Sequence, residues 1–430
     1  MQAPPPNSLL RDRGFRALLL AQLLGAFNDN VFKIVVSLLA IDAAAVGHTG
    51  GYLSLTGAVF LAPYLMFSGY AGHVADAFDK RRVLIAVKAC EIAIMALALV
   101  ALIGGRIELL LPVLFLLGAQ ATFFSPAKYG IVPEILPEAA WPRANGLLEM
   151  SRYAAVILGT ALGGMVLLWW GDRPAVLGTL MLAIATVGYA ASRRISAVPR
   201  PAADKRFRLN PWGEVAAGVR RLASCPKLMS AVAGLCFSEF VGALVLLDML
   251  LVGKETMGLD DGSTSLLGVF AGLGIGLGSI SAGHLSRGRV EIGLVPFGAA
   301  GAGFGIMALS AAAVSYAATA SAMLFVGFAG GLIIVPLYGA LQKQTGGAER
   351  GHLISTNNFL NMAAVLASSG MLWLLRDVVE IDSIQVLLIV GPVTLVATLA
   401  ALLGFPHIAA SAAEWAWSLH RWHEQAEPVP

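Results

Sequence analysis

Asn28, Asp29 and Asn30, followed by Lys33, are the residues near the N-terminus most able to do chemistry. They lie in an apolar stretch long enough to cross a bilayer as one helix, RALLLAQLLGAFNDNVFKIVVSLLAIDAAA. Asp29 and Lys33 are four residues apart on one helical face, so they could neutralise each other within the helix. That pair would not account for the two asparagines, and a charge in a membrane helix normally faces a cavity or a partner. The pattern therefore also predicts a polar binding site.

A second polar group is expected where the fourth and fifth apolar stretches meet. Lys128 ends the fourth stretch, and Asn145, Glu149 and Arg152 begin the fifth. A carboxylate can bind an ammonium group, a lysine or arginine can bind a phosphate, and an amide can bind a hydroxyl. Together with Asp29, these residues could bind a zwitterionic lipid headgroup. The alternative for Lys128 is that its side chain only extends to the membrane surface from the helix end.

Polar residues recur later in the chain. Asn357, Asn358 and Asn361 lie in the eleventh apolar stretch, with Asn357 and Asn361 about one helical turn apart. They either face the same cavity or form hydrogen bonds between helices. Lys88 and Glu91, three residues apart in the third stretch, are expected to form a structural ion pair.

Membrane-spanning helices must position these residues. Of the 430 residues, 57% are hydrophobic and 13% are charged, and the mean hydropathy is +0.77, which excludes an ordinary water-soluble domain. We expect an all-α membrane protein with twelve transmembrane helices, because apolar windows of about 20 residues recur twelve times. The windows lie near 15–44, 52–71, 83–104, 109–130, 144–170, 174–194, 228–253, 264–286, 291–314, 319–340, 354–376 and 383–405.

The sequence carries no convincing catalytic or metal-binding motif. The glycine-rich segment 272–278 resembles a phosphate-binding loop only superficially, because it lies within a span and follows no strand, so close helix packing is expected. The three cysteines imply no disulfide framework. We expect a protein that is not an enzyme, that binds no metal or cofactor and that has no nucleic-acid partner.

Lysine and arginine gather in alternate connections between the spans. Clusters occur at 80–82 and between 193 and 227, whereas the intervening connections hold mainly isolated residues such as Arg106 and Arg173. By the positive-inside rule, this distribution places both termini in the cytoplasm.

Two short motifs repeat at about half the length of the chain. Gly72-His73-Val74-Ala75-Asp76 recurs 211 residues further on as Gly283-His284-Leu285-Ser286-Arg287. Pro126-Ala127-Lys128-Tyr129-Gly130 recurs, 210 residues on, as Pro336-Leu337-Tyr338-Gly339. Such parallel repeats predict two six-helix halves, 1–194 and 228–405, in the arrangement of the major facilitator fold. A linker at 195–227 and a cytoplasmic C-terminal tail at 406–430 complete the chain.

The linker is predicted to form an amphipathic helix on the cytoplasmic membrane face. Asn210 can cap this helix and Pro211 suits its first position. An apolar stripe lies opposite Arg220 and Arg221. The stripe consists of Trp212, Val215, Val219 and Leu222.

The loop after the second span, GHVADAFDKRRVL, combines Gly72 and Asp76 with the basic residues Lys80, Arg81 and Arg82. It resembles the cytoplasmic loop pattern of major facilitator proteins. The resemblance implies that Asp76 and the basic residues latch the two halves together in one conformation, and Asp76 could meet the positive end of a helix dipole or pair with a cation. The alternative is a basic loop that only sets the orientation in the membrane.

Three segments, AFNDNVFK, GHVADAFDKRRV and FFSPAKYGIVPEILPEAAWPRANGLLEM, resemble the bacterial lysophospholipid transporter family of the major facilitator superfamily and its relatives fused to acyltransferases. In the seventh span, Glu239 and Asp248 are the ionisable residues, and no arginine is present. The resemblance implies a flippase of the bacterial inner membrane that moves lysophosphatidylethanolamine or a related lysolipid to the cytoplasmic leaflet. It also implies a separate cytoplasmic acyltransferase (acyl-ACP synthetase) partner that reacylates this cargo for phospholipid repair.

Two other functions fit the same sequence. A proton-coupled exporter of amphipathic drugs would use Asp29 as its proton carrier. A membrane scaffold that transports nothing would use the basic linker to dock an acyltransferase.

Overall fold

The structure, a computed structural model, describes residues 9–43, 49–170, 173–198 and 210–426. These residues are helical wherever they have regular secondary structure. The α-helices are α1 (Arg13–Ala43), α2 (Thr49–Ala77), α3 (Lys80–Ile103), α4 (Ile107–Ile135), α5 (Trp141–Trp170), α6 (Pro174–Ser192), α7 (Pro211–Ala223), α8 (Pro226–Leu251), α9 (Asp261–Leu285), α10 (Leu294–Ala312), α11 (Tyr316–Gln344), α12 (Arg350–Trp373), α13 (Ser383–Gly404) and α14 (Pro406–Ala426). Short segments are the 3₁₀ helices η1 (Leu9–Arg11) and η2 (Glu138–Ala140) and the π-helices η3 (Val252–Thr256) and η4 (Leu374–Val378).

Twelve helices in the described part of the chain are long and apolar enough to cross a membrane. They are α1–α6 and α8–α13, with η3 and η4 extending α8 and α12. The predicted all-helical fold with twelve spans is therefore confirmed.

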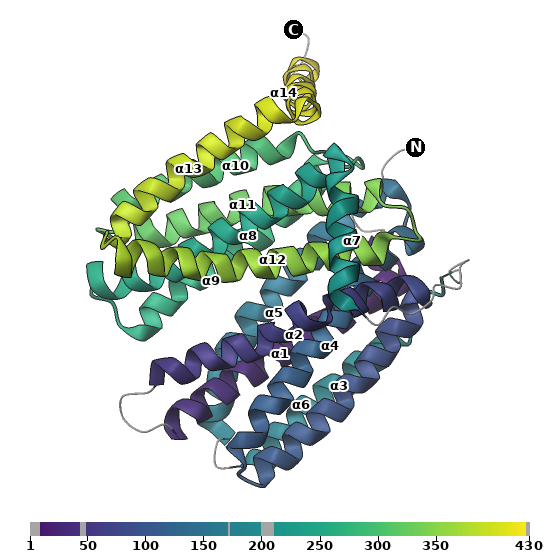
Figure 1. Cartoon of the computed structure of the whole chain (residues 1–430), viewed down its shortest axis with the longest axis vertical. Helices are drawn as coiled ribbons and strands as arrows, with labels where there is room; N and C mark the ends of the chain where they lie inside the picture. Colours follow the sequence, from purple (N-terminus) through teal and green to yellow (C-terminus); the bar gives the residue numbers. More distant parts are fainter. Residues whose placement is uncertain (1–8, 44–48, 171–172, 199–209, 427–430) are drawn as a thin grey trace.

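The spans form two groups, which we call the N half (α1–α6) and the C half (α8–α13); they are the lower and upper groups in Figure 1. Within the N half, α1 packs on α5 and α2 packs on α4, while in the C half α9 packs on α11 and α10 packs on α13. Each half has apolar clusters of its own, including Phe32 and Met95 in the first and Leu244 and Ile306 in the second. Each half can therefore act as a packed unit.

Short polar residues start several helices where the chain turns. The Asp79 side chain accepts a hydrogen bond from the backbone N–H of Arg81 at 2.9 Å and caps α3. Asp382 and Gln385 form a capping box at the start of α13. These caps satisfy backbone donors that the helix itself leaves without partners.

The linker helix α7 begins where the sequence predicts. The Asn210 side chain accepts a hydrogen bond from the N–H of Gly213 at 3.0 Å. The helix crosses α2 and α12 and so contacts both halves (Figure 1). Val215 and Leu222 are buried by this packing, whereas Trp212 is 57% exposed. Two residues of the apolar stripe therefore pack against protein while Trp212 and Val219 stay exposed, and the position of this helix on the cytoplasmic membrane face stays a prediction.

The two halves meet most closely at the end of the bundle that carries α7, which we call the linker side. There α2 packs on α12, and α5 packs on α9. An added Cβ at Gly72 would lie 2.9 Å from the Cα of His352, and one at Gly283 would lie 3.0 Å from the Cα of Arg143. The glycines of the repeated motif therefore both lie at close contacts between the halves.

Candidate functional site

A cavity of about 280 Å³ lies between the halves, and we call it the central cavity. Its walls come from α1, α2, α3, α4 and α5 of the N half and from α8, α11 and α12 of the C half. The polar and charged lining residues are Gln22, Asp29, Tyr64, Lys88, Gln120, Ser125, Lys128, Tyr129, Arg152, Glu239, Tyr338, Asn358 and Asn361. Both sequence halves therefore contribute groups that could bind one polar ligand.

Two cations at this cavity are already paired. Lys88 Nζ lies 2.6 Å from Glu91 Oε2, and Gln120 also donates to this oxygen at 3.2 Å. Because both charged residues are almost completely buried, the predicted structural pair is confirmed. Arg152 donates to Glu149 Oε2 at 2.9 Å. Each of these cations has its own carboxylate.

Asp29, Lys128 and Glu239 line the same cavity without an ion-pair partner among the described residues. The Lys128 side chain is only 6% exposed, and its Nζ lies 4.0 Å from the centroid of the Tyr129 ring. Lys128 therefore does not extend to the membrane surface in this conformation. One Asp29 oxygen is buried and makes no hydrogen bond in the described structure. Charged groups inside a membrane protein are costly without partners, so these three residues are candidates to bind a ligand.

The Asp29–Lys33 ion pair considered from the sequence is not formed within the described residues. Lys33 instead donates to Asn30 Oδ1 at 3.1 Å, and its Nζ lies 5.8 Å from the centroid of the Phe60 ring. The Asn30 amide donates to the carbonyl of Ala26 at 2.7 Å. Asp29 lines the central cavity together with Ala26 and Phe60, whereas Asn30 and Lys33 lie outside its lining.

Two stacked tyrosines border the cavity. The rings of Tyr129 and Tyr338 have centroids 4.4 Å apart and planes inclined by 9°. The Tyr129 hydroxyl donates to Glu149, the carboxylate that also binds Arg152. Glu149 itself is buried outside the lining and holds these two residues in place.

Asn145 lies in the interface between the halves and does not line the central cavity. Its amide donates to Gln342 Oε1 at 2.7 Å, and Gln342 donates to the carbonyl of Tyr129 at 2.9 Å. All three residues are buried. The group predicted to bind substrate thus joins the halves in this conformation.

The asparagines of the C half divide between two environments. Asn358 lines the cavity and donates to Ser125 Oγ of the N half at 2.8 Å. Asn361 also lines it and accepts from the Cys236 thiol at 3.3 Å. Asn357 and, in α1, Asn28 are fully buried outside the lining, and their side-chain amides make no hydrogen bond in the described structure.

Asp76 joins the two halves on the linker side. Its carboxylate accepts hydrogen bonds from the backbone N–H groups of Gly351 at 2.6 Å and His352 at 2.9 Å. These groups belong to the first turn of α12, where the helix dipole favours a negative charge. An added Cβ at Gly351 would lie 2.6 Å from Asp76 Oδ1, so only glycine permits this approach.

The three basic residues after Asp76 have partners in the N half or at the start of the linker. Lys80 lies 2.6 Å from Glu134, and Arg81 donates to the carbonyl of Ile195 at 2.6 Å. Arg82 is exposed and lies 3.7 Å from Asp79. In this conformation the contact between halves therefore comes from Gly72 and Asp76, and the cations stabilise the N half around it.

Several lining residues lie outside the set that the sequence predicts. Gln22, Tyr64 and Gln120 are single polar residues in apolar spans, a pattern that is a signal for such a role. Of the two ionisable residues in α8, Glu239 lines the cavity, whereas Asp248 is fully buried elsewhere.

Comparison with known proteins relates most of the chain to transporters of one superfamily. The family model described as Major Facilitator Superfamily matches residues 18–369. The lysophospholipid transporter LplT of Cronobacter sakazakii is 30% identical over 377 residues, which cover 85% of this chain and 89% of that protein. The protein of the same name from Photorhabdus laumondii is 30% identical over 380 residues, with coverage of 84% and 88%.

Solved transporters share the fold at low sequence identity. The transporter FucP in the outward conformation superposes with a TM-score of 0.70 at 16% identity, covering 90% of this chain and 98% of FucP. A bacterial homologue of the iron transporter ferroportin in an outward-facing state gives a TM-score of 0.64 at 16% identity, with coverage of 94% and 99%.

Proposed function

The chain belongs to the lysophospholipid transporter (LplT) family of the major facilitator superfamily, and from this membership we propose that it carries lysophospholipids across a membrane. It is a membrane transporter and not an enzyme. The proposed cargo is a lysophosphatidylethanolamine-like lipid that enters from the outer leaflet and leaves toward the cytoplasmic leaflet. There a separate acyltransferase or acyl-ACP synthetase would reacylate it.

One observation carries the proposal: Asp29, Glu239 and Lys128 border one cavity between the halves and have no ion-pair partner among the described residues. A zwitterionic phosphoethanolamine headgroup offers an ammonium group for the carboxylates and a phosphate for Lys128 and Arg152. Asn358 and Asn361 add amides that suit glycerol hydroxyls. The two signs of charge in one cavity favour such a headgroup over a simple cation or anion.

The proposed orientation follows from charge. The linker side carries the basic clusters, so the positive-inside rule assigns it to the cytoplasm of the bacterial inner membrane. Because the halves are joined there by Asp76, Asn145 and the stacked tyrosines, we interpret the conformation as outward-facing. The units that rock against each other are taken as 1–194 and 228–405, with 195–227 as linker and 406–430 as a cytoplasmic tail.

Reconstitution tests this function. Purified protein in liposomes, supplied with labelled lysophosphatidylethanolamine, is expected to move the lipid between leaflets, whereas Lys128→Gln should weaken apparent affinity about tenfold or more because a charged hydrogen bond to phosphate is lost. Lys33→Gln is the matched control, since Lys33 lies in the same half outside the cavity lining. Unchanged affinity and maximal rate in Lys128→Gln would contradict the headgroup assignment.

A proton-coupled exporter is the second candidate, because a carboxylate such as Asp29 in a membrane cavity can carry a proton. Imposed proton gradients in the same liposomes separate the two functions. Export of amphipathic drugs that stops when the gradient collapses, without movement of lysolipid, would favour the exporter.

A further inference from the structure

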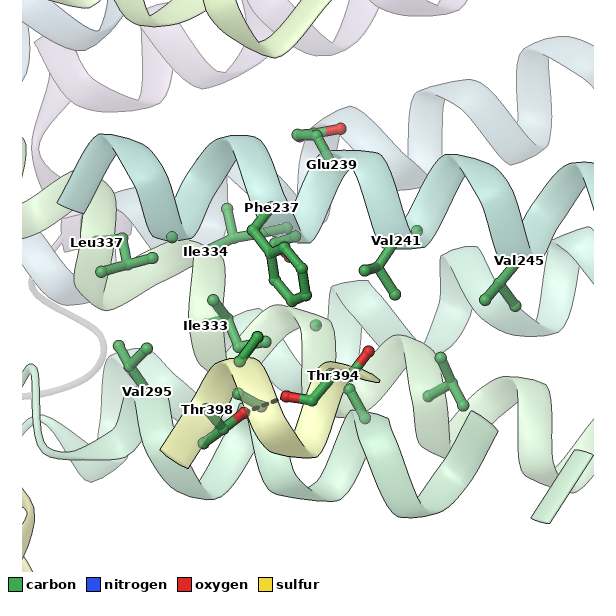
Figure 2. A pocket seen from close by; sticks show the side chains of 18 of the residues that line it. Phe237, Glu239, Val241, Val245, Val295, Ile333, Ile334, Leu337, Thr394 and Thr398 are labelled. Atoms are coloured by element: carbon green, nitrogen blue, oxygen red, sulfur yellow. Dashed lines mark hydrogen bonds between the residues drawn. The ribbon is translucent and has the colours of Figure 1, made fainter. Parts of the chain in front are cut away.

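The C half contains a second, apolar cavity, on the side of α8 that faces away from the central cavity (Figure 2). It measures about 350 Å³ and is lined mainly by α8, α10, α11 and α13, with Ala271 and Ile275 of α9, and we call it the C-half pocket. This volume falls within the range of about 300–1,000 Å³ typical of small-molecule sites. The pocket exists because α8 packs closely on α11 and α12 but only lightly on α9 and α13.

The walls of this pocket offer a ligand almost nothing but hydrocarbon. Phe237, Val241 and Val245 lie on the side of α8 that is turned toward α11 and α13 (Figure 2). The hydroxyls of Thr394 and Thr398 are also at the wall, but each donates to a backbone carbonyl of its own helix, at 2.8 and 2.7 Å. A polar ligand would find few hydrogen-bond partners there. An apolar chain needs none and would be surrounded by apolar side chains.

The C-half pocket adjoins the central cavity at one residue. Glu239 borders both spaces, and Figure 2 shows it on the opposite side of α8 from Val241 and Val245. Tyr153, next to the cavity residue Arg152, also borders the pocket. A molecule with a charged end and an apolar end could therefore occupy both spaces at once by passing beside α8.

We propose that the C-half pocket holds the acyl chain of the transported lysolipid while its headgroup occupies the central cavity. This assignment rests on the proposed function. A chain that followed its headgroup into a polar cavity would exchange lipid for water, at a cost of about fourfold in affinity for each methylene exposed. The pocket removes that cost because it keeps the chain in apolar surroundings. Its single space of about 350 Å³ also favours a lipid with one acyl chain over a lipid with two.

Gly242 allows the pocket to be filled by one substitution. It lies in α8 at the pocket wall, and a Cβ built on it would meet no atom within 4 Å. A Cβ at this position therefore displaces no neighbour, and we expect the longer side chain of Gly242→Leu to fill space at this wall. Gly370→Leu in α12 is the matched control, because that position is equally unobstructed but lies outside the pocket.

The test measures binding of long-chain lysophosphatidylethanolamine, its short-chain analogue and glycerophosphoethanolamine, which has no acyl chain. Gly242→Leu is expected to weaken binding of the long-chain lipid about tenfold or more and to leave glycerophosphoethanolamine within about twofold of wild type. Gly370→Leu should leave all three unchanged. Equal effects on all three ligands, or no effect on any, would overturn the proposal.

Photo-cross-linking of the wild-type protein gives an independent answer if Gly242→Leu fails to fold. A lysolipid with a photoreactive group at the end of its acyl chain should label peptides from α8, α9, α10, α11 or α13. Labelling confined to other helices would overturn the acyl-chain assignment alone and leave the proposed function standing. If the wild-type protein binds no lysolipid, the proposed function falls, and this assignment falls with it.

Discussion

Tyr129 and Tyr338 stack face to face across the two halves, with ring centroids 4.4 Å apart. They occupy corresponding places in the two copies of the repeated sequence motif, so the internal repeat brings its own members into contact. Both rings border the central cavity on one side, and the Gln342–Asn145 contact adjoins Tyr129. The pair therefore closes the cavity toward the linker side.

We predict that Tyr338→Ala opens the linker side, because it removes an aromatic contact that exists only when the halves are together. A well-packed aromatic at the centre of an interface contributes about 2 kcal/mol, which would shift the population about thirtyfold. The measurement is the distance between spin labels at Arg82 and Lys227, two exposed positions on the linker side of opposite halves. Tyr338→Phe should keep the wild-type distance; an unchanged distance in Tyr338→Ala would exclude the stack as a closing element.

Asp76→Ala is predicted to act in the same direction through a different contact. It removes two charge-assisted hydrogen bonds to the N-terminus of α12, each worth about 1.5–3 kcal/mol. Accessibility labelling, which reports the exposure of residues to water-soluble reagents, should therefore increase on the linker side and decrease on the opposite side. Asp79→Ala is the control, because Asp79 caps α3 within one half. If neither side changes, Asp76 has no part in closure.

The sequence could predict the helices and the repeat because both depend on local composition. A stretch long and apolar enough to span a membrane is recognisable without knowing its neighbours. The partners of polar residues are different: Asn145 meets Gln342, 197 positions away, only because two halves close on each other. Likewise Lys33 fits an ion pair with Asp29 by spacing, yet rotation of side chains gives it Asn30 instead. The first contact depends on how the halves close and is not encoded in one segment, whereas the second is a choice among side-chain conformations within one helix that spacing alone does not decide.

Asp29→Asn should reduce lysolipid transport about tenfold while leaving the amount of folded protein near the wild-type level, since Asp29 pairs with no cation in the described structure. The exchange Asp29→Lys with Lys33→Asp is the sharper variant. Because no ion pair joins the two wild-type side chains, we expect this exchange not to restore transport. Recovery of transport in the double variant would show that a pair within the helix is what matters.

Lys88→Met is predicted to destabilise the protein strongly, because it leaves Glu91 buried without its 2.6 Å partner. Breaking a buried ion pair from one side costs about 3–5 kcal/mol, whereas replacing both members with apolar residues is often neutral. The double variant Lys88→Met with Glu91→Met should therefore recover most of the thermal stability measured in detergent. A double variant as unstable as the single one would indicate that Lys88 acts through other contacts.

The linker helix is predicted to hold the linker side closed through packing more than through charge. Gly218 of α7 lies against Thr356 of α12, and an added Cβ would clash with that side chain, so Gly218→Val must displace the helix. Overpacking of this kind costs about 1–3 kcal/mol, and here the cost arises only in the closed conformation. The Arg82–Lys227 label distance should therefore lengthen in Gly218→Val.

By contrast, Arg221 pairs with Glu349 at 3.0 Å on an exposed surface, where water screens the interaction. In Arg221→Ala, the population of molecules with an opened linker side, read from the same label distances, should stay within about twofold of the wild-type value. A larger opening in Arg221→Ala than in Gly218→Val would mean that the ion pair, and not the packed face of α7, joins the linker to the C half.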